Sequence, residues 1–387
     1  MINRKISIIF AVICVTFSGC RKEDLIIGPT DSQVTEGDKL EAITGFYLLN
    51  EGNMGSNKAT LDYFDYSTGI YHKNIYADRN PGVVKELGDV GNDLQIYGNK
   101  LYAVINCSHF IEVMDVRTAR HITQISIPNC RFITFKDRYA YVSSFAGPVQ
   151  IDPNARLGYV AKIDTTSLNV VAECTVGYQP EQMVIAGDKL YVANSGGYRV
   201  PNYDRTVSVI DLNSFEVVKT IDVGINLHGM EIDQNGYIYV SSAGDYKGQR
   251  SKTFIIDSKT DEVVRELPLL PNSNMDIYKN LLYVFSNGYN DDTKKYHVSY
   301  AVWNTEKQKI ESRNFIKDGT EKEIVIPYGL AVNPENGDIL ITDAKDYVTP
   351  GTLHCYGQDG MRKWSVTTGD IPAHFAFTTK KVQGLDN

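Results

Sequence analysis

The sequence predicts an all-β fold, a seven-bladed β-propeller with four-stranded antiparallel blades, and two repeating patterns predict it. In the first, a short apolar run ends in an acidic or amide residue before a turn, at Asp65, Asp115, Asp164, Asp211, Asp257 and Asn304. In the second, an apolar residue is followed by Tyr or Leu, at positions 46–47, 101–102, 140–141, 190–191, 238–239, 282–283 and 339–340. A period of this length is typical of propeller blades, small sheets that bury their faces only against neighbouring blades.

The composition is that of a globular protein. The chain has 387 residues, of which 42% are hydrophobic and 22% charged, so it is too polar for an integral membrane protein. It contains 25 Tyr but only 2 Trp, and aromatic-rich strands favour a β-protein. The net charge is −8, and no run rich in Lys or Arg interrupts it. Because binding to phosphates needs a basic surface, nucleic acid is excluded as an expected partner.

The first residues predict export and lipidation. Residues 1–19 are expected to form a lipoprotein signal peptide, because a basic start precedes an apolar stretch too short to span a membrane. Small residues stand directly before Cys20, as in a bacterial lipobox, so Cys20 is predicted to carry the lipid. Residues 21–24 resemble the surface-export signal of Bacteroidota lipoproteins. We therefore expect an outer-membrane location on the extracellular face, with the membrane contacted through the lipid anchor only. A plain signal peptide is the alternative.

Residues 20–43 are expected to form a flexible tether, since they are polar and show little periodicity. The propeller is expected to occupy residues 44–380, followed by a C-terminal tail at 381–387. In the clearest unit the four strands, from the axis outward, are expected at 182–186, 190–194, 206–211 and 217–223, with Gly and Asn or Asp at the turns.

The two ends of the propeller predict how the ring closes. Folding begins at Phe46, which matches the second strand of a unit, so the first blade lacks an innermost strand at the N-terminus. Residues 371–377 resemble an innermost strand and are expected to complete that blade. A ring closed in this way leaves no open sheet edge at the seam.

Long loops predict the functional face. Loops from second to third strands emerge at the same end of every blade as the loops that precede innermost strands, because the strands are antiparallel. The long ones are 50–57, 143–156, 194–204, 241–250, 286–294 and 343–351. Loops of this kind on a rigid scaffold are where binding residues concentrate.

The candidate ligand-binding residues lie in these loops and at the mouth of the ring. The aromatic candidates offer stiff, flat surfaces: Phe145, Tyr198, Tyr203, Tyr246, Tyr289, Tyr328 and Tyr347. The polar candidates are Asn53, Asn92, Arg131, Glu181, Gln182, Arg199, His228, Asn274 and His374. This mixture suits a large, semi-rigid ligand with apolar faces and many polar arms. Surface aromatics without a ligand are the alternative.

Nothing in the sequence predicts catalysis, a cofactor or a resident metal. The sequence lacks Gly-x-Ser-x-Gly, His-Glu-x-x-His, a phosphate loop and a dinucleotide motif. Two alternatives remain open: His228 and His374 as metal ligands or acid and base, and Glu181 with Asn53 and Asn272 around a calcium ion. The periodic aspartates are interpreted as turn residues.

The cysteines of the predicted mature chain, other than Cys20, show no zinc-site spacing. Cys107 and Cys130 fall near the same end of adjacent blades, so a disulfide between them is left open. Free, buried thiols are favoured for both, and for Cys174 and Cys355.

Two family resemblances follow from these residues. The unit formed by residues 187–196 and 206–213 resembles YncE-like seven-bladed propellers, over nearly all of residues 44–380. The opening Leu49–Gly55, the leader and the tyrosine-rich loops resemble BtuG-type surface lipoproteins of Bacteroidota. This second resemblance implies a non-enzymatic protein that captures cobalamin (vitamin B12) and other corrinoids as bound ligand. It also implies transfer to a TonB-dependent outer-membrane transporter of the BtuB type. The alternatives are a metal-dependent propeller hydrolase or lyase, and a surface adhesin or scaffold that binds protein or glycan.

Overall fold

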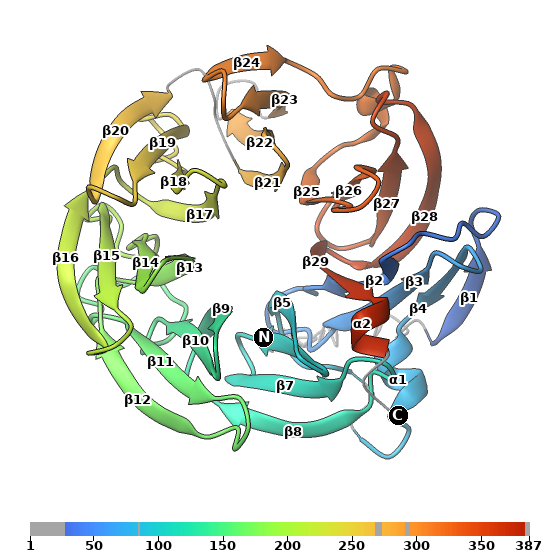
Figure 1. The fold of residues 1–387 in the computed structure, drawn as a ribbon, viewed down its shortest axis with the longest axis horizontal. Coiled ribbons are helices and arrows are strands. Elements are labelled where there is room, and N and C mark those ends of the chain that lie inside the picture. The colour runs from blue at the N-terminus through green and yellow to red at the C-terminus, as the bar shows by residue number, and fades with distance from the viewer. Residues whose placement is uncertain (1–27, 84–85, 268–272, 291–294, 384–387) are drawn as a thin grey trace, which may run out of the picture.

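The computed structural model describes residues 28–83, 86–267, 273–290 and 295–383, and its strands form a ring of seven antiparallel sheets (Figure 1). The predicted fold class, a seven-bladed β-propeller, is confirmed. Cys20 and the predicted signal peptide at 1–19 lie outside the described residues, so both stay predictions.

Blades 2 to 7 have four strands each, which follow one another from the axis outward. Blade 2 contains β5 (Gly91–Tyr97), β6 (Lys100–Ile105), β7 (Phe110–Asp115) and β8 (His121–Ser126). Blade 3 contains β9 (Cys130–Lys136), β10 (Tyr139–Ser144), β11 (Tyr159–Asp164) and β12 (Val170–Thr175). Blade 4 contains β13 (Pro180–Ala186), β14 (Lys189–Asn194), β15 (Thr206–Asp211) and β16 (Glu216–Asp222).

The next three blades repeat this order. Blade 5 contains β17 (Leu227–Ile232), β18 (Tyr237–Ser242), β19 (Lys252–Asp257) and β20 (Glu262–Leu267). Blade 6 contains β21 (Asn274–Tyr278), β22 (Leu281–Asn290), β23 (Lys295–Asn304) and β24 (Lys309–Ser312). Blade 7 contains β25 (Pro327–Val332), β26 (Ile339–Asp343), β27 (Pro350–Tyr356) and β28 (Arg362–Asp370).

Blade 1 joins the two ends of the propeller. Its strand order from the axis outward is β29 (Pro372–Thr379), β2 (Ile43–Asn50), β3 (Thr60–Asp65), β4 (Ile70–Lys73) and β1 (Thr30–Gln33). Strands β2 and β29 are antiparallel, with Phe46 opposite Phe377 and Leu48 opposite Phe375. The predicted closure by a C-terminal strand is thereby confirmed.

Strand β1 differs from the sequence prediction, which places residues 30–33 in the tether. These residues pair with β4 and give blade 1 a fifth strand. All four side chains of β1 are exposed, so it is held by its backbone and by local polar bonds such as Asp31 to the His72 ring at 2.8 Å. A strand without a buried face leaves no hydrophobic alternation in the sequence.

The hydrophobic core lies between the blades. Among the described residues, each pair of neighbouring blades shares a cluster of buried side chains. Val207 and Val209 of blade 4, for example, pack with Ile238 and Ile256 of blade 5. Blades 7 and 1 share such a cluster too, so the closed ring buries both faces of every sheet.

The periodic acidic residues make the turns at one end of the ring, as predicted. The Oδ1 atom of Asp211 accepts hydrogen bonds from the backbone N–H groups of Asn213 and Ser214, at 3.0 and 2.9 Å. Equivalent bonds form at Asp65, Asp115, Asp164, Asp257 and Asn304. We call this the turn end of the ring and the opposite one the loop end.

One predicted long loop is partly strand. Strands β22 and β23 continue as a hairpin beyond Ser286, with Asn287 opposite Val298 and Tyr289 opposite Tyr296. The prediction of a loop from residue 286 is therefore wrong for residues 286–290. Antiparallel pairing of the flanking residues satisfies backbone groups that an irregular loop would leave to solvent.

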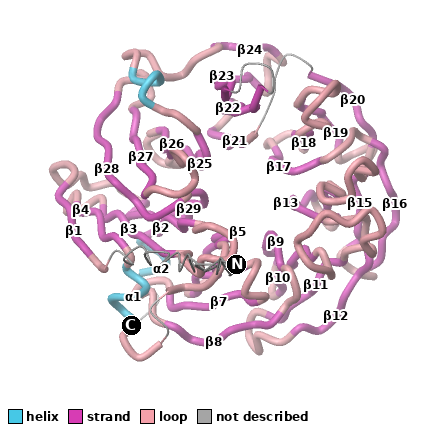
Figure 2. Tube along the Cα trace, turned by 180° about the vertical axis from the view of Figure 1, so that it is seen from behind, coloured by secondary structure: helices cyan, strands magenta, loops and turns pink. Residues whose placement is uncertain are grey.

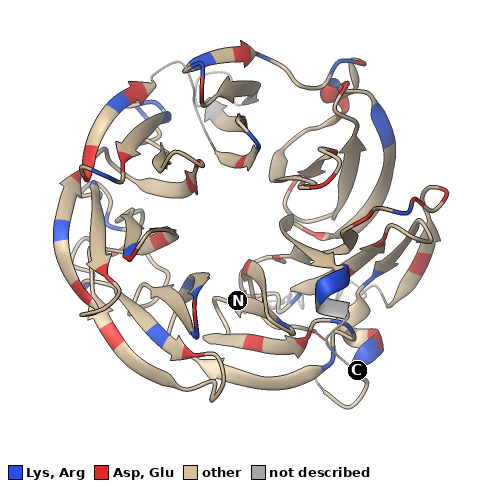
Figure 3. Ribbon diagram, in the orientation of Figure 1, with Lys and Arg blue, Asp and Glu red and all other residues tan. Residues whose placement is uncertain are grey.

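Helices are minor elements; the last of them directly follows the innermost strand β29, and the others lie toward the outside of the ring (Figure 2). They are α1 (Ile75–Arg79), the 3-10 helix η1 (Thr320–Glu323) and α2 (Lys380–Gln383). Within the part of the chain that the structure describes, none has the length and apolar character needed to cross a membrane. Basic and acidic residues are interspersed around the blades (Figure 3).

Candidate functional site

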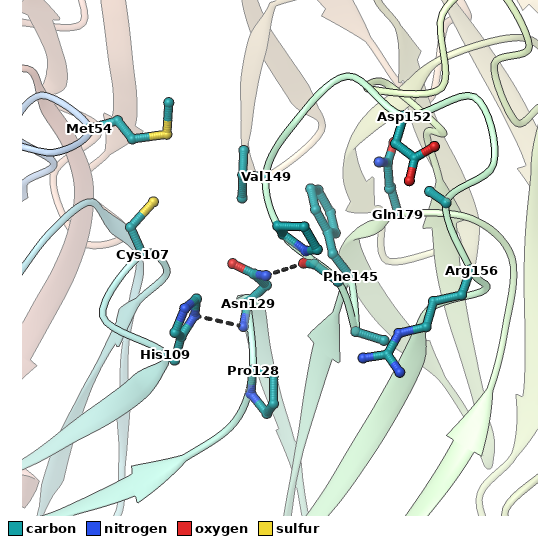
Figure 4. A pocket seen from close by; sticks show the side chains of 14 residues that line it. Met54, Cys107, His109, Pro128, Asn129, Phe145, Val149, Asp152, Arg156 and Gln179 are labelled. Atoms are coloured by element: carbon teal, nitrogen blue, oxygen red, sulfur yellow. Dashed lines mark hydrogen bonds between the residues drawn. The ribbon is translucent and has the colours of Figure 1, made fainter.

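A hollow of about 730 Å³ opens at the loop end of blades 1 to 4 (Figure 4). Its exposed lining is mostly apolar. The lining residues come from five connections at this end of the ring, those before β3, β7, β9, β11 and β13. They are Met54, Cys107, His109, Pro128, Asn129, Phe145, Ala146, Gly147, Pro148, Val149, Asp152, Ala155, Arg156 and Gln179. The hollow lies at the end of the ring where the sequence places the long loops.

The long loop between β10 and β11 forms one wall of the hollow. Its first residue, Phe145, is buried and donates its backbone N–H to the Asn129 carbonyl at 3.1 Å. Farther along, the Asp152 N–H donates to the Tyr198 carbonyl of blade 4 at 2.8 Å. The wall is therefore held by the connection from blade 2 to blade 3 and by blade 4.

Two strained residues connect blades 2 and 3 within the hollow. His109 and Asn129 have φ angles of 63° and 43°, in the left-handed region that His and Asn tolerate better than most residues. The Asn129 backbone N–H donates to Nδ1 of His109 at 3.2 Å, and its side-chain Nδ2 donates to the Gly147 carbonyl. These bonds fix both side chains within the lining (Figure 4).

A buried ion pair lies beside the aromatic wall. Nε of Arg131 is 3.0 Å from Oε2 of Glu181. The Arg131 guanidinium is 4.7 Å from the ring centre of Phe145, which meets the Tyr198 ring edge-on at 6.2 Å. Burial, the largest single cause, works to lower the pKa of Arg131, but the charge and the hydrogen bond of Glu181, with smaller contributions from Tyr198 and Glu51, together raise it. The guanidinium therefore stays charged and holds the wall from below by a cation–π contact.

A second polar group lies at the seam of the ring. The Tyr328 hydroxyl donates to Oε2 of Glu51 at 2.8 Å, and Nε2 of His374 lies 3.0 Å from the other Glu51 oxygen. Burial, then the charge of Glu51, raises the pKa of Tyr328 well above its usual value. Tyr328 therefore remains protonated and also meets the Tyr347 ring edge-on at 5.8 Å.

Several predicted ligand residues use at least one side-chain polar atom in a hydrogen bond to the protein backbone. Asn92, Asn274 and Asn53 donate side-chain hydrogen bonds to the backbone carbonyls of Arg131, Tyr328 and Tyr347. Oε1 of Gln182 accepts from the Met230 N–H at 3.1 Å, which links blades 4 and 5. The exposed His228 ring is 5.9 Å from the ring of Phe132.

The remaining candidates lie outside the lining. Arg199 stacks on Tyr178 at 3.5 Å, Tyr203 is half-buried, and Tyr246 is 71% exposed. The side chain of Tyr289, and all of Asn272, lie outside the described residues. Of the predicted ligand residues whose side chains the structure describes, only Phe145 lines the hollow, whereas Arg131, Glu181 and Tyr198 pack behind it.

The sequence prediction missed most of the lining, including Met54, Cys107, His109 and Gln179. The prediction followed aromatics in long loops, but several of these residues lie in short connections. One signal was present, since Asn129 and Gln179 directly precede innermost strands at the predicted mouth.

The cysteines that the structure describes, Cys107, Cys130, Cys174 and Cys355, are free, and Cys107 and Cys130 do not form a disulfide. The prediction that all are buried is wrong for Cys107, which is half-buried and lines the hollow. Burial, then the charge of Asp89, raises the pKa of Cys107, so this group is a neutral thiol. Within the described ranges, no three His, Cys, Asp or Glu side chains are grouped to hold a metal ion.

Comparisons with known proteins place the fold and the family. No curated protein matches the sequence. Among solved structures, the chain is similar to hydrazine synthase of Kuenenia stuttgartiensis, with 16% identity and a TM-score of 0.56. That match covers 70% of this chain and 77% of the other, and at this identity it shows the fold alone. Residues 44–360 match the family described as a domain of unknown function, DUF5074. The chain therefore belongs to the DUF5074 family.

Proposed function

We propose that this protein is a non-enzymatic, lipid-anchored surface protein that captures cobalamin and other corrinoids. The observation that carries this proposal is the mostly apolar hollow at the loop end, with few polar groups in its lining. Ligand sites of this kind use apolar walls for affinity and placed polar groups for orientation. Corrinoids have methyl-fringed apolar faces and amide arms, and therefore match both properties.

The aromatic wall supports a rigid, flat ligand. Phe145 is held by Arg131 on one side and by Tyr198 on another, so its ring loses little freedom on binding. The ring is only 2% exposed, so it gives the hollow a fixed apolar backing that costs little entropy when a ligand binds. The hollow also remains open to solvent at the loop end, where a large ligand can project beyond it.

The proposed location and partner rest on the sequence. A lipid at Cys20, followed by the export-like residues 21–24, would hold the ring on the extracellular face of the outer membrane. We propose that the bound corrinoid then passes to a TonB-dependent transporter of the BtuB type. The resemblance of Leu49–Gly55 and of the tyrosine-rich loops to BtuG-type lipoproteins supports this assignment.

Co-elution tests the proposal. Purified protein mixed with micromolar cyanocobalamin and passed over a sizing column is expected to elute as a pink peak, and titration calorimetry should give one site per chain. A colourless protein peak would overturn the corrinoid assignment. Turnover of a substrate that is lost on chelation would favour the hydrolase or lyase instead. Binding of a protein or glycan by a chain that takes no corrinoid would favour the adhesin.

Transfer to a transporter needs a separate measurement. Membranes containing the transporter are expected to retain the lipidated protein, and cells lacking this protein should take up less cobalamin at low external concentration. Unchanged uptake at every concentration would contradict the transfer step while leaving capture intact.

A further inference from the structure

His109 and Asn129 each use one polar atom for the protein and leave another in the lining of the hollow. They come from different blades, His109 from the connection before β7 and Asn129 from the connection before β9. Both hold left-handed φ angles, and they are joined by the bond from the Asn129 backbone to the His109 ring. Their relative position is therefore set before a ligand arrives.

The bond to His109 decides which ring nitrogen carries hydrogen. A backbone N–H can only donate, so Nδ1 of His109 must accept the bond from Asn129. In the neutral imidazole, the hydrogen then lies on Nε2, which becomes a donor. None of the described residues accepts a hydrogen bond from Nε2, and His109 is exposed in the lining.

Asn129 presents the complementary atom. Its Nδ2 donates to the Gly147 carbonyl, which orients the amide and leaves Oδ1 as an acceptor. Among the described residues, none donates to Oδ1, although the residue is only 5% exposed. Figure 4 shows the oxygen end of this amide turned toward the side of Cys107. Oδ1 itself is not fully buried, so it can be reached from the hollow and gains from a partner that a ligand supplies.

We infer that His109 and Asn129 together recognise a primary carboxamide of the ligand. Nε2–H of His109 donates to the carboxamide oxygen, and Oδ1 of Asn129 accepts from its NH₂ group. A carboxylate cannot satisfy this pair, because it has no hydrogen for Oδ1. This assignment rests on the proposed function and extends it, by stating which chemical group of a corrinoid is read in the hollow and by which residues.

The surroundings strengthen this selection. On the side of His109, Met54 and the neutral thiol of Cys107 bring no charge, whereas the charged lining residues Asp152 and Arg156 lie on the other side of Phe145 (Figure 4). A weakly polar environment makes each hydrogen bond stronger and each unpaired polar atom more costly. The ratio of the affinities for a carboxamide and for a carboxylate is therefore expected to be larger here than at a solvent-exposed contact.

The test compares cobalamin with its monocarboxylates, in each of which one peripheral carboxamide is hydrolysed to a carboxylate. We expect the wild-type protein to bind one of these monocarboxylates about 10- to 100-fold more weakly than it binds cobalamin. A loss of this size is typical when a buried polar group is left unpaired. In His109→Phe, cobalamin affinity should fall about tenfold, and the difference between cobalamin and that acid should shrink. His72→Phe, on β4 beside the outermost strand of blade 1 and outside the hollow, is the matched control.

The outcomes separate the two proposals. If the wild-type protein binds no corrinoid, the proposed function fails. If it binds cobalamin and all the monocarboxylates equally well, the carboxamide site is overturned and the function stands. If His109→Phe weakens every ligand by the same factor, His109 is a structural residue and the inference is again overturned. A circular-dichroism melt of each variant verifies that it is folded.

Discussion

The two ends of the ring are built from the same strands but use polar groups in opposite ways. At the turn end, Asp211 and its equivalents bond to the backbone two and three residues farther on. At the loop end, Asn129 and His109 bond to each other across two blades and leave polar atoms in the hollow. The aspartates are satisfied within one turn and stabilise the scaffold, whereas His109 and Asn129 each keep one polar atom available to a ligand.

The largest expected effect comes from breaking the ion pair behind the hollow. Arg131→Met leaves the carboxylate of Glu181, which is 4% exposed, without its cationic partner. We expect a loss of about 3 kcal/mol in the free energy of unfolding, measured with urea. The double variant Arg131→Met, Glu181→Leu should recover most of this loss. A single variant as stable as wild type would show that the pair contributes nothing to the fold.

Phe145→Ala should separate binding from folding. Removing the ring takes away the aromatic wall and uncovers Arg131, so cobalamin affinity should fall roughly 30- to 100-fold by calorimetry. Phe215→Ala is the control, because this half-buried ring packs on Tyr141 close to the Asp211 turn. Equal effects of the two substitutions on affinity would contradict the assignment of binding to the loop end.

Asp211→Ala tests the turn end alone. The substitution removes the acceptor of two backbone N–H groups and of the Ser214 hydroxyl. We expect Tm to fall by a few degrees in calorimetry and cobalamin affinity to stay unchanged. A change in affinity without a change in Tm would show that the two ends are coupled.

The smallest expected effect is a change in how the free energy of unfolding depends on pH in acid. Backbone N–H groups of Thr349 and Val348, with the Thr349 hydroxyl, lower the pKa of Asp346 from 3.8 to about 2. A carboxylate whose pKa is lowered by folding stabilises the folded state at pH values above its pKa in the unfolded chain. That contribution is lost as the pH falls from about 4 to 2. Asp346→Asn should therefore lose less stability than wild type in this window, as measured by urea unfolding. Because Asp346 is exposed, a slope identical to that of wild type would mean that solvent screens its bonds fully.

Much of the scaffold could be predicted from local sequence. The third strand of blade 4 was expected at residues 206–211 and is β15, with those bounds. Closure by residues 371–377 was also predicted, because the missing innermost strand of blade 1 and the extra C-terminal strand share one pattern. Strand β1 could not be predicted, since its pairing depends on the backbone edge of β4 and not on its own side chains.

The sequence by itself determined the number of blades, the Asp-containing turns and the end of the ring that carries the long loops. Each of these depends on contacts within one repeat, where hydrophobic alternation and turn residues act over a few positions. Only the tertiary structure decided which side chains meet at the hollow. His109 and Asn129 are 20 positions apart and belong to different blades, so their contact depends on how two sheets pack and on the strained backbone at both residues.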